Sequence, residues 1–372
     1  MTCAYWGNGY ANSRQEGSLP IEIVTGWPLS TVAFAANGEY TVGGGAETVG
    51  VWQVEDGKQM ATLDCHRVCS LAGSKDGRWI IAGTFDGERF LWDAKTFERV
   101  FFHREPDDDD WHAPITGFDF SPDSTRFVTA KKNRTAAIWD VATRKKVQTL
   151  DHDRGVIAAK YSPQGDRIAT ATYNGSVRVW DSNDGRLLMD IPVKVTPECN
   201  TGLLWSNNHL FVVSDSAIKQ LEASTGSTVS EWPVRNASSM SCIALPKHGE
   251  FITYSTKDTV TFWDTSTHAQ LGLIQLPQRL YSVALSPDGR FLATGGKGGG
   301  ITVRSLSRIT VSVVFLRIMP HLNNVLVSLG FPNGIQSVCL VTIPPSRNLT
   351  SRSITPRSSH GRTISSRTRT RY

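Results

Sequence analysis

The stretch RFLWD at residues 89–93 recurs along the chain as a short β-rich run with a tryptophan near its end. The other copies are GVWQV (50–54), AAIWD (136–140), VRVWD (177–181) and VTFWD (260–264). From Trp52 the tryptophans follow at steps of 40, 47, 41 and 83 residues, the last being about two steps. A period of this length indicates a repeat protein in which each unit is one supersecondary structure.

Two further positions complete the series. AIKQLEASTG aligns with VRVWDSNDG and places Leu221 where a tryptophan would stand, and ITVRSL places Arg304 one step after Trp263. The chain therefore has seven anchor positions: 52, 92, 139, 180, 221, 263 and 304.

A tight turn lies 13 to 15 residues before each anchor. Examples are SKDGR at Gly77, SPQGD at Gly165, SNNH at Asn208 and SPDGR at Gly289, whose Gly, Asn and Asp residues suit such turns. The segments on either side are strand-like, and a fourth strand such as KVQTL (146–150) follows each anchor. Each unit is thus predicted to be four antiparallel strands.

These features resemble the WD40 repeat family over about residues 20–304, and the body is similar to WD40 proteins of mushroom-forming fungi. The resemblance implies an all-β fold, a seven-bladed propeller over residues 19–307, after an N-terminal extension (1–18) and before a tail (308–372). The last repeat lacks a fourth strand on its C-terminal side. The resemblance implies that LPIEIV (19–24) supplies that strand and closes the ring.

Two side-chain sets resemble the hydrogen-bond network that holds blades together in this family. They are His66, Thr84, Asp86 and Trp92 in one repeat, and His152, Thr172, Asn174 and Trp180 in another. Ser/Thr, His and Asp could also form a catalytic triad. We favour the structural interpretation because the sets follow the repeat.

Two other clusters suggest metals but fit them poorly. Cys65-His66-x-x-Cys69 has no second pair at zinc-finger spacing. Asp107–Asp110 lacks the alternating ligands and the turn glycine of a calcium loop, so a solvated acidic loop is favoured. We therefore predict no metal, no cofactor and no catalytic residue.

A propeller presents rigid loops on two faces, and the resemblance places the turn between second and third strands beside the loop that enters the first strand. Aromatic and arginine residues, which are enriched at interface hot spots, gather in these loops. The predicted protein-binding residues are Arg67, Phe85, Trp111, Arg154 and Tyr173. The predicted function is a non-enzymatic protein–protein interaction scaffold. The alternatives are a substrate receptor or assembly subunit of a larger complex, in ubiquitin ligation or ribosome biogenesis, and a propeller hydrolase.

Charge divides the chain into two parts. Residues 305–372 contain nine Arg and no Lys, Asp or Glu, which leaves 30 basic and 34 acidic residues before them, a net charge of −4. Nucleic acid is therefore an expected partner only through the tail. The tail is either a disordered basic arm or an artefact of translating non-coding sequence, and both interpretations stay open.

The remaining expectations concern location and assembly. No secretory signal and no apolar run long enough for a membrane span are recognisable. We expect reduced cysteines, a cytoplasmic or nuclear protein and a monomeric propeller.

Overall fold

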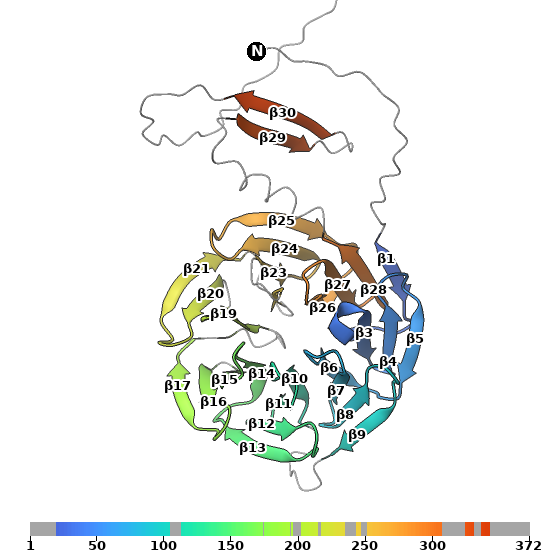
Figure 1. Ribbon diagram of the computed structural model, residues 1–372, viewed down its shortest axis with the longest axis vertical. Coiled ribbons are helices and arrows are strands. Elements are labelled where there is room, and N and C mark those ends of the chain that lie inside the picture. The colour runs from blue at the N-terminus through green and yellow to red at the C-terminus, as the bar shows by residue number, and fades with distance from the viewer. Residues whose placement is uncertain are drawn as a thin grey trace, which may run out of the picture. The chain divides into compact units, whose positions relative to one another are not determined.

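The computed structural model describes residues 20–104, 113–173, 175–193, 195, 202–214, 217–234, 243–246 and 251–306, and the backbone of 324–330 and 336–342. In the first of its two compact units, seven four-stranded antiparallel sheets are arranged as blades around a central axis (Figure 1). We name the strands of each blade a to d from the axis outward. This confirms the predicted all-β, seven-bladed propeller.

The blades follow chain order, except that the last one takes its outermost strand from the N-terminal side. Blade 1 consists of β2 (Leu29–Ala35), β3 (Tyr40–Gly45), β4 (Val49–Gln53) and β5 (Gln59–Leu63). Blade 2 consists of β6 (Val68–Gly73), β7 (Trp79–Thr84), β8 (Arg89–Asp93) and β9 (Arg99–His103). Blade 3 consists of β10 (Ile115–Phe120), β11 (Arg126–Lys131), β12 (Thr135–Asp140) and β13 (Lys146–Asp151).

Blade 4 consists of β14 (Val156–Tyr161), β15 (Arg167–Thr172), β16 (Val177–Asp181) and β17 (Leu187–Ile191). Blade 5 consists of β18 (Leu203–Ser206), β19 (His209–Val213), β20 (Ala217–Glu222) and β21 (Thr228–Pro233). Blade 6 consists of β22 (Ile243–Ala244), β23 (Phe251–Ser255), β24 (Thr259–Asp264) and β25 (Gln270–Gln275). Blade 7 consists of β26 (Leu280–Leu285), β27 (Phe291–Gly296), β28 (Gly300–Ser305) and β1 (Ile21–Val24).

The seven anchors occupy one equivalent position, near the end of strand c. Trp139 pairs with Phe127, Trp180 with Ile168, and the non-tryptophan anchor Leu221 pairs with Leu210 in the same register. In the six blades that continue into their own strand d, the pairing with that strand shifts by one residue at the anchor. Such a bulge bends the strand and increases its twist, so the anchor marks the place where each blade turns outward.

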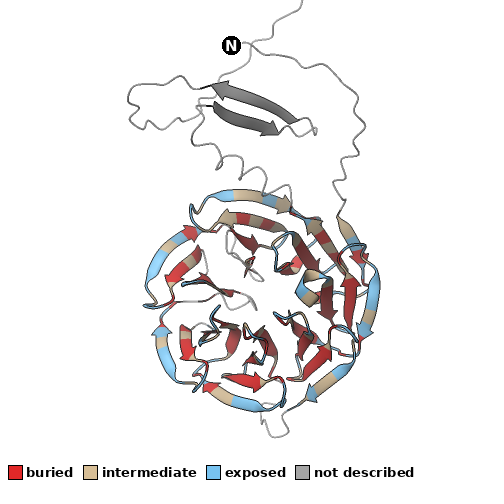
Figure 2. Cartoon of the chain, in the orientation of Figure 1, coloured by how far each residue is buried: buried red, intermediate tan, exposed pale blue. Residues whose placement is uncertain are grey.

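The core lies between neighbouring blades. Strands a of adjacent blades contact one another around the complete ring, including β2 with both β6 and β26. One apolar cluster joins Val42 and Val51 of blade 1 to Ile80 and Trp92 of blade 2, and corresponding clusters fill the other boundaries. Burial therefore falls from the inner strands to strand d, which is largely exposed (Figure 2).

Ring closure occurs as predicted, since β1 pairs antiparallel with β28, with Ile23 opposite Ile301. Alternate residues of β1 differ sharply in exposure: Ile23 is 6% exposed and Val24 is 87% exposed. The Ile23 side chain packs in a cluster with Leu29 and Trp52 of blade 1. The strand thus covers the edge of blade 7 and also contributes to the core between blades 7 and 1.

The second unit (residues 311–372) contains a two-stranded antiparallel sheet of β29 (Asn324–Gly330) and β30 (Gln336–Thr342). This hairpin was not expected from the sequence, in which residues 308–372 were predicted to be a disordered or artefactual tail. The expectation of a disordered or artefactual tail otherwise falls on residues outside those described. Among the described residues, no helix has the length and apolarity that a membrane span requires.

Exchange of Ile23 for Asp tests ring closure. The substitution buries a carboxylate in the cluster between blades 7 and 1, and we expect the free energy of unfolding to fall by about 3 kcal/mol or more. Val24→Asp is the matched control, because it makes the same change one residue further along the strand, where the side chain is exposed. Thermal melting followed by circular dichroism measures both, and equal melting temperatures would contradict the closure.

Candidate functional site

The antiparallel strands sort the loops of the propeller onto two faces. The upper face holds the b–c turns and the loops that join strand d of one blade to strand a of the next. Backbone hydrogen bonds join these two kinds of loop: Phe85 donates to Arg67 O over 2.9 Å and Tyr173 to Gly155 O over 2.8 Å. The lower face holds the a–b and c–d turns.

The structure places the predicted binding residues on the upper face, wherever it describes them. Phe85 and Tyr173 occupy the same b–c turn position in blades 2 and 4, and they are 42% and 47% exposed. The Arg67 and Arg154 side chains lie in the adjoining loops and are more than half exposed. Arg67 Nη1 donates to Asp86 Oδ1 over 2.7 Å, which fixes its guanidinium to the b–c turn that carries Phe85. Trp111 lies outside the described residues.

Blade 4 contains a buried side-chain chain of hydrogen bonds. Trp180 Nε1 donates to Thr170 Oγ1 over 2.8 Å, and Thr170 Oγ1 lies 2.8 Å from His152 Nε2. His152 Nδ1 lies 2.9 Å from the Leu150 carbonyl oxygen, which can only accept. Nδ1 therefore carries the proton, and Nε2 accepts from the threonine hydroxyl.

The network differs from the predicted set in the threonine. Thr172, the expected member, instead accepts a hydrogen bond from the Ser176 backbone N–H within its own b–c turn. Thr170 takes the role because it lies two residues further from the b–c turn, opposite Arg178 and within reach of the Trp180 indole nitrogen. Asn174 lies outside the described residues.

The predicted network of blade 2 is wrong. His66 is exposed, and the neighbouring Cys65, 1% exposed, packs in the cluster that contains Trp92. Ala82 stands where blade 4 has Thr170, so this blade has no hydroxyl at that position. Trp92 stacks on Phe90 with the ring centroids 5.6 Å apart, and apolar packing replaces the hydrogen bonds.

Thr84 and Asp86, the other predicted members of the blade 2 network, make their contacts at the b–c turn of that blade. The Thr84 hydroxyl accepts from the backbone N–H groups of Asp86 and Glu88, over 3.2 and 3.1 Å. The Asp86 carboxylate pairs with Arg67 rather than with His66. Thr84 and Asp86 thus shape the upper-face turn that carries Phe85.

Cys65 and Cys69, the cysteines of the possible metal motif, are core residues. Burial raises the pKa of both thiols above the ordinary value, that of Cys69 to about 12, so both stay protonated at neutral pH. Cys69 Sγ donates to Ile115 O of blade 3 over 3.0 Å, and Thr116 at the equivalent position donates to Val156 O of blade 4 over 2.8 Å. These thiol and hydroxyl groups therefore join neighbouring blades. Within the described chain, no group of three or more His, Cys, Asp or Glu side chains could hold a metal ion.

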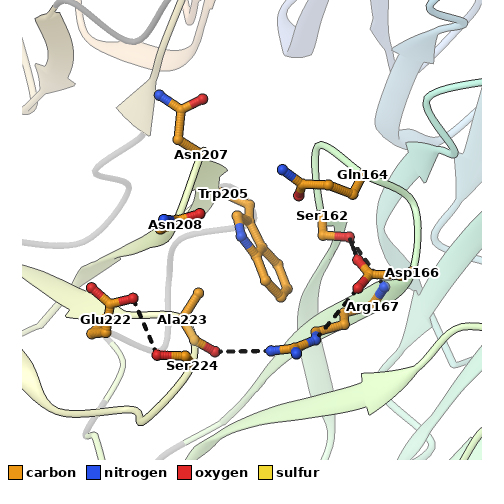
Figure 3. Close-up of a pocket in the computed structure, with 10 residues that line it drawn as sticks. All are labelled: Ser162, Gln164, Asp166, Arg167, Trp205, Asn207, Asn208, Glu222, Ala223 and Ser224. Carbon is orange, nitrogen blue, oxygen red and sulfur yellow. Dashed lines mark hydrogen bonds and ion pairs between the residues drawn. The ribbon is translucent and has the colours of Figure 1, made fainter.

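The lower face contains a pocket of about 390 Å³ between blades 4 and 5 (Figure 3). Its walls are the a–b turns of both blades and the c–d turn of blade 5, and the indole of Trp205 stands in its centre. Arg167 closes one side, where it donates to Ala223 O over 3.4 Å across the blade boundary. Arg126 makes the same contact one blade earlier, with Ser182 O over 3.3 Å.

Sequence reasoning missed Thr170 and this pocket, although both have a signal. Thr129 and Thr170 each precede their anchor tryptophan by 10 residues, and both accept a hydrogen bond from its indole nitrogen. The pocket lies where the turn SNNH is shorter than its counterparts, a difference that is visible in the sequence.

Four stretches of the chain match the family model for the WD domain, G-beta repeat: residues 57–93, 109–140, 144–181 and 275–304. They cover strands a to c of blades 2, 3, 4 and 7, and the first and third matches also include the preceding strand d. Together with the ring of seven sheets, these matches support a propeller of the WD40-repeat class.

The chain is similar to WD repeat-containing protein 1 of Mus musculus, with 33% identity over 84 residues. That stretch covers 23% of this chain and 14% of the mouse protein. The similarity therefore concerns the repeats and not the whole of either protein.

Replacement of Thr170 by Val tests the blade 4 network. The substitution keeps the shape of the side chain but leaves the His152 and Trp180 ring nitrogens without their shared partner. We expect the free energy of unfolding to fall by about 1–3 kcal/mol. Thr129→Val is the matched comparison. A single indole nitrogen loses its acceptor there, so the free energy of unfolding should fall by less. Equal losses in urea unfolding would contradict the role given to Thr170.

The same network predicts a pH dependence. Burial lowers the pKa of His152 to about 4 from its ordinary 6.5, so the folded state keeps the ring neutral while the unfolded chain takes up a proton. The contribution of His152 to stability is therefore complete above about pH 6.5 and is lost as the pH falls towards about 4. The difference in melting temperature between the wild type and His152→Gln should shrink from pH 7 to pH 4.5. A constant difference would contradict the depressed pKa.

Proposed function

We propose that the chain is a non-enzymatic protein–protein interaction scaffold that binds its partners through the upper face of blades 2 to 4. The observation that carries this proposal is the repeated exposure of an aromatic ring at one turn position. Phe85 and Tyr173 are equivalent residues of blades 2 and 4, and each has an exposed arginine in the adjoining loop.

The chemistry of these residues suits protein recognition. Aromatic and arginine side chains carry much of the binding energy at interfaces, because they desolvate a large area with few rotatable bonds. Their turns are held by backbone hydrogen bonds to the neighbouring loops, so little order has to be gained on binding. Exposed rings on rigid turns therefore favour a preformed protein-binding surface.

The buried polar groups of blade 4 support a structural role for its histidine network. His152 is 8% exposed, and its two ring nitrogens are engaged by the Leu150 carbonyl and the Thr170 hydroxyl. A general base must reach its substrate. The geometry thus favours the scaffold over the hydrolase.

Two narrower forms of the proposal concern the complex to which the scaffold belongs, in the cytoplasm or the nucleus. A substrate receptor of a ubiquitin ligase would co-purify with ligase subunits, and a ribosome-assembly subunit would sediment with precursor particles. Density-gradient sedimentation of a cell extract, followed by mass spectrometry of the fractions that contain this chain, separates the two.

The upper face is tested by changing all five predicted residues together. Arg67, Phe85, Trp111, Arg154 and Tyr173 are replaced by Ala or Ser, and we expect the loss of most partner proteins in affinity purification from the native host. The control variant carries Ala at Lys58, Lys95, Arg144 and Arg186, four exposed residues of the c–d turns on the lower face. Both variants are first compared with the wild type by circular dichroism. A folded upper-face variant that retains every partner would contradict the proposal.

A further inference from the structure

The a–b turn of blade 5 is shorter than the others that the structure describes. Between the paired residues Tyr161 and Ile168, the blade 4 turn has six residues (162–167), and the pairing of strands a and b gives six in blades 1, 2, 3 and 7 as well. Between the equivalent residues Trp205 and Leu210, blade 5 has four (206–209). Blade 5 thus lacks two residues at this place.

The longer turns pack against one another around the lower face. A side chain added at Gly165 of blade 4 would lie 3.1 Å from Pro122 of blade 3, and one at Gly289 of blade 7 would lie 2.9 Å from Pro246 of blade 6. The blade 5 turn, Ser206-Asn207-Asn208-His209, contains neither a glycine nor a proline. The short turn therefore opens the boundary between blades 4 and 5, where the pocket lies.

Trp205 is the residue that the short turn uncovers. Its counterparts in the two preceding blades, Phe120 of blade 3 and Tyr161 of blade 4, are 0% and 3% exposed, whereas Trp205 is only partly buried and lines the pocket. A partly exposed indole offers an apolar face with a negative quadrupole, which attracts cations.

The groups around the indole favour a cation. Asp166 and Glu222 contribute two carboxylates and Arg167 one guanidinium, so the lining has a net charge of −1 (two negative, one positive). Arg167 is occupied, since it lies 3.6 Å from Asp166 and donates to Ala223 O. Among the described residues, the Glu222 carboxylate contacts the Ser224 hydroxyl at 3.2 Å and the imidazole of His209 at 3.6 Å, and it is the carboxylate that we expect to receive a ligand.

The polar remainder of the pocket suits a peptide. Gln164, Asn207 and Asn208 present side-chain amides, which can donate to and accept from backbone groups. The volume of about 390 Å³ lies in the lower part of the range of small-ligand sites, about 300–1,000 Å³. It fits one long side chain with its own peptide groups.

We propose that this pocket binds an arginine side chain presented by a partner protein. The guanidinium stacks on Trp205 and pairs with Glu222, as a planar cation does better than an ammonium group. The site lies on the face opposite to the proposed upper-face site. The experiments on one site therefore do not decide the other.

Fluorine NMR of the full chain tests the pocket directly. Growth with 5-fluorotryptophan gives eleven signals, one for each tryptophan, and Trp205→Phe identifies the Trp205 signal by its loss. N-acetyl-arginine N-methylamide is the probe, and the citrulline analogue is its neutral isostere. We expect a saturable shift of the Trp205 signal with the arginine probe, a shift at least fivefold smaller with citrulline, and no shift of the buried Trp232 of the same blade.

Variants assign the contact. Glu222→Gln should lower the affinity of the pocket for the arginine probe about three- to tenfold. Glu231→Gln, an exposed carboxylate of the same blade outside the pocket, should leave its affinity unchanged. Equal shifts with citrulline, or an unchanged affinity in Glu222→Gln, would overturn the proposal.

Discussion

Hydrogen bonding between β1 and β28 joins the two ends of the repeat array, and the rest of the ring depends on it. Each blade buries its apolar faces only between two neighbours, so an open array would expose one face at each end as well as the edge of β28. The closing strand covers both the open edge and the open face, because its backbone pairs with blade 7 and Ile23 packs against blade 1. The polar contacts between blades then form in a closed ring in which the position of each blade is fixed.

Within that ring, the same backbone register tolerates different chemistry. Blade 4 links its anchor tryptophan through Thr170 to a neutral histidine, whereas blade 2 uses Cys65, Ala82 and a stacked Phe90 in the same space. Either solution fills the volume beside the anchor. The repeat therefore constrains volume and backbone pairing more strongly than it constrains side-chain polarity, which explains why Leu221 can also serve as an anchor.

This difference explains which features could be predicted from the sequence. The strands, the anchors and the closing strand follow from period and hydrophobic pattern, which report backbone pairing directly. The network could not be assigned in the same way. Thr170 and Thr172 point to the same side of one strand, and only the reach of the His152 and Trp180 side chains selects between them. His66 was mistaken for a member because the loop before blade 2 places the adjacent Cys65 in the core. The pocket depends on the length of the a–b turn of blade 5, a signal that appears only when the repeats are compared with one another.

Blade 4 takes part in both proposed sites and shows how the propeller separates them. Tyr173 and Arg154 lie at the upper ends of its strands, and Gln164 and Asp166 lie in the turn at the lower ends. Strands of six residues span about 20 Å, so partners on the two faces do not meet. The strands between them are close-packed and hydrogen-bonded on both sides, which leaves little freedom to transmit a shift from one face to the other. With both proposed sites occupied, such a propeller would hold two partners at a fixed distance and orientation, and the affinity of one site would not depend on the occupancy of the other.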